Sequence, residues 1–418
     1  MSDGPLRRPI TRRSALRAGK LAALAGGLAA CTSSSTQSRA TSPSARAIAS
    51  SYPLPSVGPT RTVAAPTATH DVRTFGAVGD GIADDTDAIV HALAALKPGE
   101  ALQFPAGKVF CHAQVLTVRT AEVQLLGPGT LRATAEQTSA LQVQAANVTI
   151  DGLTLAIGST TKRWSSPDQH KLVLGAYSGA VIRNVTITGS AAAGVFGLGA
   201  SNFLVQSVQV SNTRADGIHL TDGCTNGFVV APMITSSGDD GVAVVSYATD
   251  RAICRAITVI SPRVHTTTGG RGVSVVGGQQ IVYADVQVSN SNAAAVYIAC
   301  EGGDSVTMPV TDVRVTGGAL IGSNTNPNID HGAVLVYSGR PSGGVSDVVI
   351  TGLRVTGTRL TASRQVGVVA NPGAQVSAVS FVDLDLTALP KPYQGDAPAG
   401  SVTLRKVTAD GATVPSPG

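Results

Sequence analysis

Short runs of Val, Ile and Leu, separated by Gly, Asn, Ser and Thr, recur along most of this chain. From Leu102 onward they follow one another at intervals of roughly 22 to 30 residues, the range in which solenoid repeats fall. One such run cannot bury its apolar side chains alone, whereas stacked coils share a continuous core. A propeller would show a longer period with signature dipeptides, which this sequence lacks. The repeat therefore predicts an all-β fold, a parallel β-helix. Clear examples of the runs are residues 147–153, 183–189, 203–210, 284–290, 345–352 and 378–384.

The composition suits a narrow coil interior. The chain has 47 glycines, which fit tight corners, and asparagine tolerates the left-handed geometry that such corners use. Aromatic residues make up only 4% of the chain, so we expect an interior filled mainly by Val, Ile and Ala.

One helical segment precedes the repeats. Its apolar residues recur at helical spacing, at Ala88, Ile89, Ala92, Leu93 and Leu96. Pro98 and Gly99 end the segment. Asp80, Asp84 and Asp85 lie before it, where acidic side chains suit the positive end of a helix. These aspartates are conceivable metal ligands, but we expect them to cap the helix.

The first residues have the pattern of an export signal. Arg12 and Arg13 form a twin-arginine pair, and the apolar run that follows is too short to span a bilayer. The run ends in Leu-Ala-Ala-Cys at 28–31, which resembles the site at which bacterial lipoproteins are cleaved and acylated. We therefore expect a twin-arginine lipoprotein signal at residues 1–31 and lipidation of Cys31. The protein would then be held at the cell surface or the periplasmic face of the membrane by its lipid alone.

Composition also divides the rest of the chain. Residues 32–69 are rich in Ser, Thr, Ala and Pro, so we expect a disordered linker there, a parallel β-helix catalytic domain at 70–408 and a flexible tail at 409–418.

The net charge of +5 comes from the signal, which holds six of the 31 Lys and Arg residues but only one of the 26 acidic residues. The rest of the chain has 25 basic and 25 acidic residues. We therefore expect no nucleic-acid partner.

Four cysteines follow the signal, and their spacing matches no zinc pattern. Cys224 and Cys254 are about one long coil apart, so a disulfide between them and a pair of buried free thiols both remain open. The other two are Cys111 and Cys300.

Three aspartates stand at glycine-flanked starts of apolar runs. Asp216 lies in Ala-Asp-Gly-Ile-His at 215–219, and Asp239 and Asp240 lie in Ser-Gly-Asp-Asp-Gly-Val at 237–242. Asp216 and Asp239 are 23 residues apart, which is one repeat, so stacked coils would bring the three carboxylates to one face. Crowded carboxylates repel one another, and at least one should hold a proton near neutral pH. This arrangement suits acid/base hydrolysis of a glycosidic bond.

These blocks, followed by Gly-Gly-Arg-Gly-Val-Ser-Val at 269–275, resemble the ordered motifs of the polygalacturonases, glycoside hydrolase family 28. The glycine-rich segment at 74–89 resembles the start of the pectin-lyase-like superfamily. The resemblance implies a single-stranded right-handed parallel β-helix solenoid with a short N-terminal capping helix. It implies that Asp239 is the general acid and that Asp216 and Asp240 activate a water, which attacks with inversion. Inversion requires carboxyl separations of about 6.5–9.5 Å. The resemblance implies no metal or other cofactor.

Several positions depart from that family. Arg271 stands where the family has histidine, and Gly241 and Arg214 stand where it has cysteine and asparagine. Near residues 296–299, where the family binds a uronate carboxylate, this chain has neither Arg nor Lys. We therefore expect a glycan other than ordinary polygalacturonate, with Tyr297 and Arg271 lining its subsite.

Two long polar loops interrupt the repeats and are expected to wall a binding groove. The loop at 158–171 carries the only tryptophan, Trp164, which would either stack on a sugar ring or cover the rim of the coils. In the first case Arg163 or Lys162 would touch a polar group of the sugar. The loop at 323–331 ends in Asp330 and His331, for which we expect a structural role.

His219 follows Asp216 closely, and we expect it either beside the substrate site or on the surface.

Two other functions remain open. A polysaccharide lyase of the same fold would bind Ca²⁺ through the aspartates and place Arg271 near the proton to be abstracted. A non-catalytic surface solenoid would bind glycans and use the aspartates to cap its turns. In each case the expected partner is a polysaccharide or oligosaccharide, and we expect a monomer.

Overall fold

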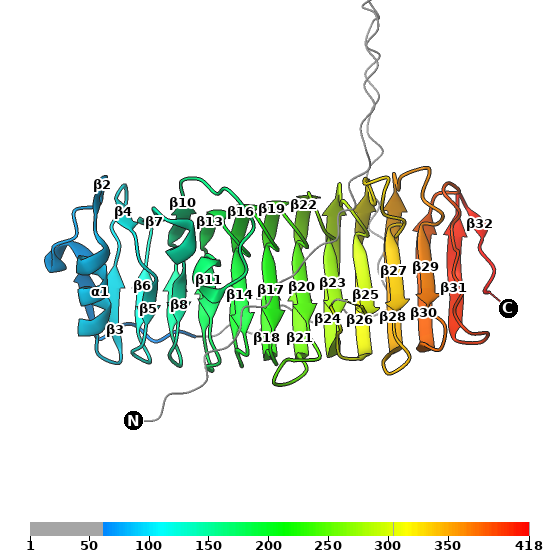
Figure 1. Ribbon diagram of the computed structural model, residues 1–418, viewed down its shortest axis with the longest axis horizontal. Helices are drawn as coiled ribbons and strands as arrows, with labels where there is room; N and C mark the ends of the chain where they lie inside the picture. The colour runs from blue at the N-terminus through cyan, green and yellow to red at the C-terminus, as the bar shows by residue number, and fades with distance from the viewer. Residues whose placement is uncertain (1–61, 304, 418) are drawn as a thin grey trace, which may run out of the picture.

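The chain forms a stack of parallel β-coils in the computed structural model, which describes residues 62–303 and 305–417. Figure 1 shows the coils following one another along the long axis, from a helix at the N-terminal end to the last strands at the other. Neighbouring coils pair in parallel and in register, as in the pairs Val195 with Ile218 and Ile218 with Val242. The predicted all-β parallel β-helix is confirmed.

In the described residues, two sheets form the walls of the coils, one of ten strands and one of 22. The ten-stranded sheet consists of β5 (Leu116–Val118), β8 (Leu141–Val143), β11 (Leu172–Leu174), β14 (Val195–Leu198), β17 (Ile218–Thr221), β20 (Val242–Val245), β23 (Val273–Val276), β25 (Val296–Cys300), β27 (Val334–Ser338) and β29 (Val366–Ala370). The early strands of the larger sheet are β1 (Ala68–Asp71), β2 (Asp80–Asp84), β3 (Glu100–Gln103), β4 (Val109–His112), β6 (Gln124–Leu126), β7 (Thr130–Ala133), β9 (Thr149–Asp151), β10 (Thr154–Ile157), β12 (Val181–Arg183), β13 (Thr186–Ser190), β15 (Leu204–Gln206) and β16 (Gln209–Thr213). Its later strands are β18 (Thr225–Val230), β19 (Met233–Ser237), β21 (Arg255–Ile260), β22 (Arg263–Thr267), β24 (Gly278–Ser289), β26 (Val310–Ile321), β28 (Gly344–Thr356), β30 (Gln375–Leu386), β31 (Val402–Ala409) and β32 (Ala412–Thr413). The short 3₁₀ helices are η1 (Val72–Phe75), η2 (Glu136–Thr138) and η3 (Pro167–Gln169).

The predicted helix is α1 (Thr86–Ala95), at the N-terminal end of the stack. It buries Ile89, Ala92 and Leu93 and packs against η1 and β5. The first coil has no preceding coil to cover its apolar end, and α1 supplies that cover.

The aspartates before α1 hold backbone turns. Asp84 accepts a hydrogen bond from the N–H of Thr86, the first helical residue, at 3.0 Å. Asp85 is the N-cap residue, yet its buried carboxylate points back to the loop and accepts from the N–H of Val78 at 2.6 Å. Asp80 accepts from the N–H of Ile82 at 2.7 Å. Of the three, only Asp84 caps the helix through its side chain, because the other two carboxylates satisfy the glycine-rich turn.

Val, Ile and Ala are buried in the interior, as the composition predicts, but Leu is buried there as well, with a few large rings at intervals such as Phe104, Phe203 and Phe381. Asparagine occupies left-handed corners at matching places in neighbouring coils, with φ angles of 49° at Asn202 and 52° at Asn226.

All four described cysteines are buried free thiols. Cys224 and Cys254 occupy matching positions of neighbouring coils, directly before the paired residues Thr225 and Arg255. Of the two alternatives left open by the sequence, the structure has the free thiols.

Coil length varies more than the repeats suggest. Hydrogen bonds between neighbouring coils join Asp216 and Asp240, which are 24 positions apart, and Thr311 and Ser346, which are 35 apart. At the C-terminal end, the boundary predicted at 408 falls inside β31, and β32 then turns back antiparallel to it. Part of the expected flexible tail is therefore a strand, because it pairs with β31 at the open end of the sheet.

The expected signal at 1–31, including Cys31, lies outside the described residues, as does the expected linker up to residue 61. The domain predicted to start at 70 already has strand β1 from Ala68. In the described part of the chain, no helix has the length and apolar character needed to cross a bilayer.

Candidate active site

Glycines stacked on successive coils let those coils approach one another closely. Each glycine lies directly before a strand of the ten-stranded sheet, and we call this series the glycine column. A Cβ atom added at Gly217 would lie 2.6 Å from the carbonyl oxygen of Gly241, and one at Gly241 would lie 2.6 Å from that of Gly272. Real Cβ atoms do not come so close, so glycine is required there. The residues directly before this column are Asp216, Asp240 and Arg271, which are therefore stacked on successive coils.

The structure brings all three predicted aspartates together, with a different register from the one expected. Because Ile218 pairs with Val242, Asp216 lies opposite Asp240 and not opposite Asp239. The N–H of Asp240 donates to Asp216 Oδ1 at 3.0 Å. One oxygen from each of Asp216, Asp239 and Asp240 lies within 4.8 Å of the others, and all three residues are buried. We call these three residues the carboxylate cluster.

Each carboxylate has its own partner. Asp216 Oδ2 lies 2.9 Å from His219 Nδ1. Asp239 Oδ2 forms an ion pair of 2.8 Å with Arg163 Nη1, which reaches it from the loop at 158–171. Asp240 accepts from the N–H of Arg271 at 2.8 Å and from Ser274 Oγ at 2.5 Å. The sequence pointed to His219 and Arg163 as substrate contacts, and the structure also ties them to the cluster itself.

Asp240 is the carboxylate that retains a proton. Its pKa is raised from 3.8 to about 7, mainly by burial and also by the charges of Asp239 and Asp216, against the opposing effect of Arg271. The expectation that one carboxylate of the cluster is protonated near neutral pH agrees with this value. The larger cause is burial, whereas the sequence argument relied on repulsion.

Arg271 belongs to a buried network on the next coils. Its guanidinium lies 3.7 Å from Asp240 Oδ1 and 3.1 Å from Glu301 Oε1, and it covers the ring of Tyr297 at 4.3 Å. The Tyr297 hydroxyl donates to Glu301 at 3.1 Å, and its ring stacks on His331 at 5.2 Å. Tyr297 is only 3% exposed. Arg271 and His331 cover its ring, and Tyr297 is not among the residues that line the pocket described below, so its expected place at a subsite stays a prediction.

His331 lies far along the chain from the aspartates, but the loop at 323–331 folds back over Tyr297. Burial lowers the pKa of His331 to about 4, so its ring is neutral near pH 7. Asp330 accepts from the N–H of Ser363 at 2.8 Å, away from the carboxylate cluster. The expected structural role fits both residues, since His331 supports Tyr297 and Asp330 anchors the loop.

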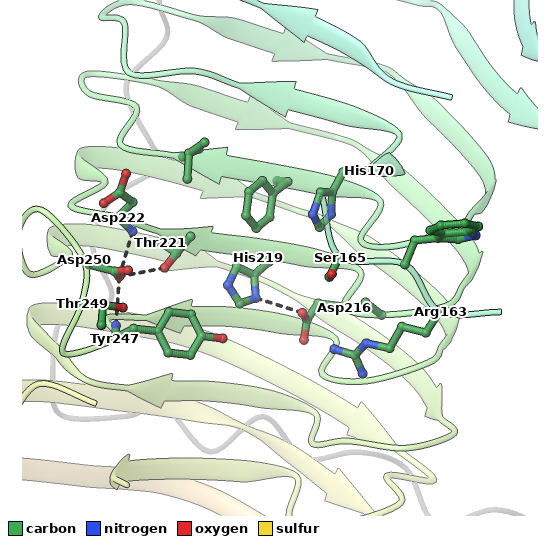
Figure 2. Close-up of a pocket in the computed structure, with 14 residues that line it drawn as sticks. Arg163, Ser165, His170, Asp216, His219, Thr221, Asp222, Tyr247, Thr249 and Asp250 are labelled. Atoms are coloured by element: carbon green, nitrogen blue, oxygen red, sulfur yellow. Dashed lines mark hydrogen bonds and ion pairs between the residues drawn. The ribbon is translucent and has the colours of Figure 1, made fainter. Parts of the chain in front are cut away.

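A pocket of about 370 Å³ opens beside Asp216 on the side of the earlier coils. Figure 2 shows His219 in its middle, Asp216 and Arg163 at one end, and Asp222 with Asp250 at the other. Four rings stack across successive coils along one wall, with centroid distances of 3.8, 5.3 and 6.4 Å between consecutive members. In order they are His170, Phe196, His219 and Tyr247.

Trp164 also lines this pocket. Its indole N–H donates to Glu136 Oε2 at 2.5 Å, and Lys162 Nζ lies 4.0 Å from the ring centroid. These contacts hold the loop at 158–171 against η2 and orient Trp164 at the mouth of the pocket. Trp164 therefore lies beside the pocket, and the expected stacking of its ring on a sugar stays a prediction.

Sequence reasoning missed Phe196, Ser274 and Glu301, and also the group Asp222, Thr221 and Asp250. A signal for the first two was present, because each follows a glycine of the column by two positions, as His219 does. Aligning the repeats on Gly194, Gly217, Gly241 and Gly272 would have found this outward-facing series. Glu301 and Asp250 lie in coil-to-coil loops of varied length and had no such signal.

The carboxylate cluster is close enough for its oxygens to share one divalent cation. Its charges are already balanced, however, by the guanidinium groups of Arg163 and Arg271. Ca²⁺ prefers six to eight oxygen ligands, and these cations would compete with it directly. The donors present therefore fit a metal poorly.

The sequence matches a family model described as rhamnogalacturonase A/epimerase, pectate lyase-like, over residues 69–299. No curated protein is significantly similar in sequence. The narrower resemblance to polygalacturonases is not repeated by this match and stays a prediction.

Solved structures share the fold at low identity. The catalytic domain of a GH87 α-1,3-glucanase in complex with tetrasaccharides has a TM-score of 0.58 and 15% identity, covering 84% of this chain and 67% of that one. The GH87 α-1,3-glucanase of Streptomyces thermodiastaticus has a TM-score of 0.59 and 19% identity, covering 84% and 72%. The A-module of the mannuronan C-5 epimerase AlgE4 of Azotobacter vinelandii has a TM-score of 0.56 and 12% identity, covering 80% and 99%.

At these identities the structures establish the fold alone. The family match supports a stronger conclusion, because it spans more than half of the chain. The matched residues include α1, the carboxylate cluster and Arg271. The chain therefore belongs to the rhamnogalacturonase A/epimerase, pectate lyase-like family.

Proposed function

We propose that this protein is a glycoside hydrolase that cleaves a polysaccharide by acid/base catalysis at Asp216, Asp239 and Asp240. The observation that supports this is a cluster of three buried carboxylates that carries one proton near neutral pH and borders a pocket. A glycosidic bond needs both an acid for its leaving oxygen and a base for the attacking water, and one singly protonated cluster supplies both.

Asp239 is the group that meets the glycosidic oxygen. It is the most exposed of the three, at 9% against 3% for Asp216 and Asp240. Both oxygens of Asp240 are occupied, by the N–H of Arg271 and by Ser274, so Asp240 serves as the resting site of the proton. The proton passes through the cluster to Asp239 and on to the leaving oxygen. A water attacks the anomeric carbon and returns its proton to the cluster, which restores the starting state.

Inversion of the anomeric carbon is the outcome that the polygalacturonase resemblance implies, and it remains part of the proposal. The oxygens of the cluster, at 4.8 Å or less, are closer than the separation of about 6.5–9.5 Å that inverting enzymes use. Inversion therefore requires Asp239 to swing outward with Arg163 when substrate binds. Proton NMR of the first anomer released tests this step, and a retained configuration would assign a covalent intermediate instead.

The substrate is a glycan other than ordinary polygalacturonate. β25 offers neither Arg nor Lys, and Arg271 is committed to Asp240 and Glu301. Arg163 is likewise paired with Asp239, so each cation at the cluster already faces a carboxylate of the protein. A uronate would have to break one of these pairs to be recognised.

The test is an assay of the full chain on polygalacturonate, rhamnogalacturonan, α-1,3-glucan, alginate and bacterial wall polysaccharides. Reducing ends and ultraviolet absorbance of unsaturated products are followed together, with and without a chelator. Hydrolysis predicts reducing ends that resist the chelator, without new absorbance, and that disappear in Asp239→Asn. Asp347→Asn, an exposed aspartate in β28 that makes the same change of charge, is the matched control.

A lyase or epimerase is the second candidate, because the description of the family names epimerases and pectate lyase-like proteins. An absorbance increase that the chelator abolishes would favour the lyase, and a changed uronate configuration without cleavage would favour the epimerase. No change in any glycan would favour a non-catalytic glycan-binding solenoid.

We also propose that the protein is exported by the twin-arginine route and anchored by a lipid on Cys31, as a monomer. The twin-arginine pair and the Leu-Ala-Ala-Cys site support this. Fractionation of cells that express the full chain tests it. Cys31→Ala should move the protein from the membrane fraction to the soluble fraction, and sedimentation should give the mass of one chain.

A further inference from the structure

We propose that the pocket beside Asp216 is a subsite for one neutral hexose unit of the substrate, with Asp250 as the residue that binds its hydroxyl groups. This inference adds a substrate class to the proposed function. The part that the subsite plays in hydrolysis rests on that proposed function, whereas sugar binding in the pocket can be tested without it.

One wall of the pocket consists of stacked aromatic rings. Phe196 and His170 stack at 3.8 Å with an angle of 8° between their planes, and His219 follows Phe196 at 5.3 Å. Burial lowers the pKa of His170 to about 3, so that ring is neutral at any ordinary pH. Aromatic walls of this kind give a sugar a large van der Waals contact area. A volume of about 370 Å³ has room for one or two sugar rings.

The far end of the pocket carries a carboxylate that is held rigidly. Asp250 Oδ2 accepts three hydrogen bonds, from Thr221 Oγ1 at 3.0 Å and from the N–H groups of Asp222 and Tyr247 at 3.1 and 2.9 Å. None of the described residues donates a hydrogen bond to the other oxygen, Oδ1. Asp250 lines the pocket, as Figure 2 shows, so this second oxygen is an acceptor for a hydroxyl group of a ligand.

The charges around the pocket select the class of sugar. In the described part of the chain, three carboxylates line it, those of Asp216, Asp222 and Asp250, and a uronate would meet them with a like charge. Among the described residues, the cation that lines it is Arg163, which faces Asp239 and would oppose an ammonium group in the same space. Arg251 neutralises Asp222 through an ion pair of 2.8 Å. A neutral hexose avoids both penalties.

The position of the pocket relates it to the reaction. Asp216 belongs to both the carboxylate cluster and the pocket wall, so a sugar bound there lies next to the bond to be cleaved. Recognition of a neutral sugar in this pocket would explain why β25 lacks the Arg and Lys that the resemblance to polygalacturonases predicts.

Binding of monosaccharide probes to the full chain tests the subsite without any turnover. The probes are the methyl glycosides of glucose, galactose, mannose and rhamnose, with galacturonate and glucosamine, each titrated while bound sugar is followed by saturation-transfer NMR. At least one neutral glycoside should bind at millimolar concentration and galacturonate at least tenfold more weakly. Asp250→Asn should weaken the neutral probe by about tenfold, since a hydrogen bond to a charged group is lost. Phe196→Leu, which keeps apolar bulk, should weaken it as well, and Asp347→Asn should leave it unchanged.

The outcomes separate this proposal from the proposed function. Tighter binding of galacturonate or glucosamine, or no binding of any neutral probe, would overturn the subsite even if the protein hydrolyses a glycan. Equal binding by the wild type and by a folded Asp250→Asn protein would do the same. Binding of a neutral sugar that both variants weaken would support the subsite even if no glycan is cleaved.

Discussion

Arg163 and Asp239 are 76 positions apart in the chain and joined by an ion pair of 2.8 Å. Arg163 comes from the loop at 158–171, which Trp164 and η3 hold over the coils, whereas Asp239 comes from the carboxylate cluster. The orientation of the proposed acid therefore depends on a loop that belongs to a different coil.

Removing this ion pair should harm activity far more than stability. The pair is partly exposed, so Arg163→Ala should change the free energy of unfolding by less than about 1 kcal/mol. The rate of glycan hydrolysis should fall by about tenfold or more, because Asp239 loses its orienting partner. Arg163→Lys should recover part of the loss. Arg314→Ala removes an exposed ion pair with Asp312 in β26 and should leave activity unchanged. A stable Arg163→Ala protein with full activity would show that the pair has no part in the reaction.

The activity of the hydrolase should fall as the pH rises above about 7. The cluster needs one proton to protonate the leaving oxygen, and its last proton leaves with the Asp240 pKa of about 7. A profile of kcat/KM against pH checks this. Activity that increases through pH 7 and stays high would mean that the fully ionised cluster is the active form.

Asp240 should also make stability depend on pH. Its pKa is 3.8 in the unfolded chain and about 7 in the folded one, so between these values only the folded chain keeps the proton. The free energy of unfolding of the wild type should therefore decrease from about pH 4 to about pH 7 relative to that of Asp240→Asn, and the difference should be constant above about 7. Urea unfolding of both proteins across this range measures it. A difference that stays flat from pH 4 to 7 would contradict the raised pKa.

Lys171 is a buried base that the proposed reaction does not use. Its ammonium donates to the carbonyl of Ser139 at 3.0 Å, and burial lowers its pKa from 10.5 to about 7. Between these values the unfolded chain binds the extra proton, so the wild type gains stability as the pH rises. Lys171→Met should be more stable than the wild type at pH 7 by roughly 1–3 kcal/mol, and this gain should shrink toward pH 10. Lys97→Met, at an exposed lysine, is the control and should show no such trend.

The glycine column predicts a sharp contrast between two Gly→Ala variants. At Gly241 a Cβ atom would lie 2.6 Å from the Gly272 carbonyl, so Gly241→Ala should cost roughly 1–3 kcal/mol of stability and shift Asp240. At Gly158 a Cβ atom meets nothing within 4 Å, and Gly158→Ala should be tolerated. Thermal unfolding and activity measure both effects. Equal tolerance at the two positions would mean that the coils can move apart at the column.

Much of the fold could be predicted from the sequence, because its causes are local. The period of the apolar runs requires stacked coils, and the helical spacing of Ile89, Ala92 and Leu93 produces α1. The glycines beside Asp216 and Asp240 already marked the positions where coils come close, and so brought the carboxylates together. The sequence also indicated that one of them would hold a proton.

The register and the pocket were decided only by the tertiary structure. Asp216 pairs with Asp240, one residue beyond the expected repeat, because each coil takes its register from hydrogen bonds to its neighbour and not from a constant length. His331 covers Tyr297, and Arg163 reaches Asp239, because long loops fold back across several coils. The sequence by itself determined a parallel β-helix with an aspartate cluster. Stacking and loop closure between distant residues determined which partner each carboxylate has and what space lies beside it.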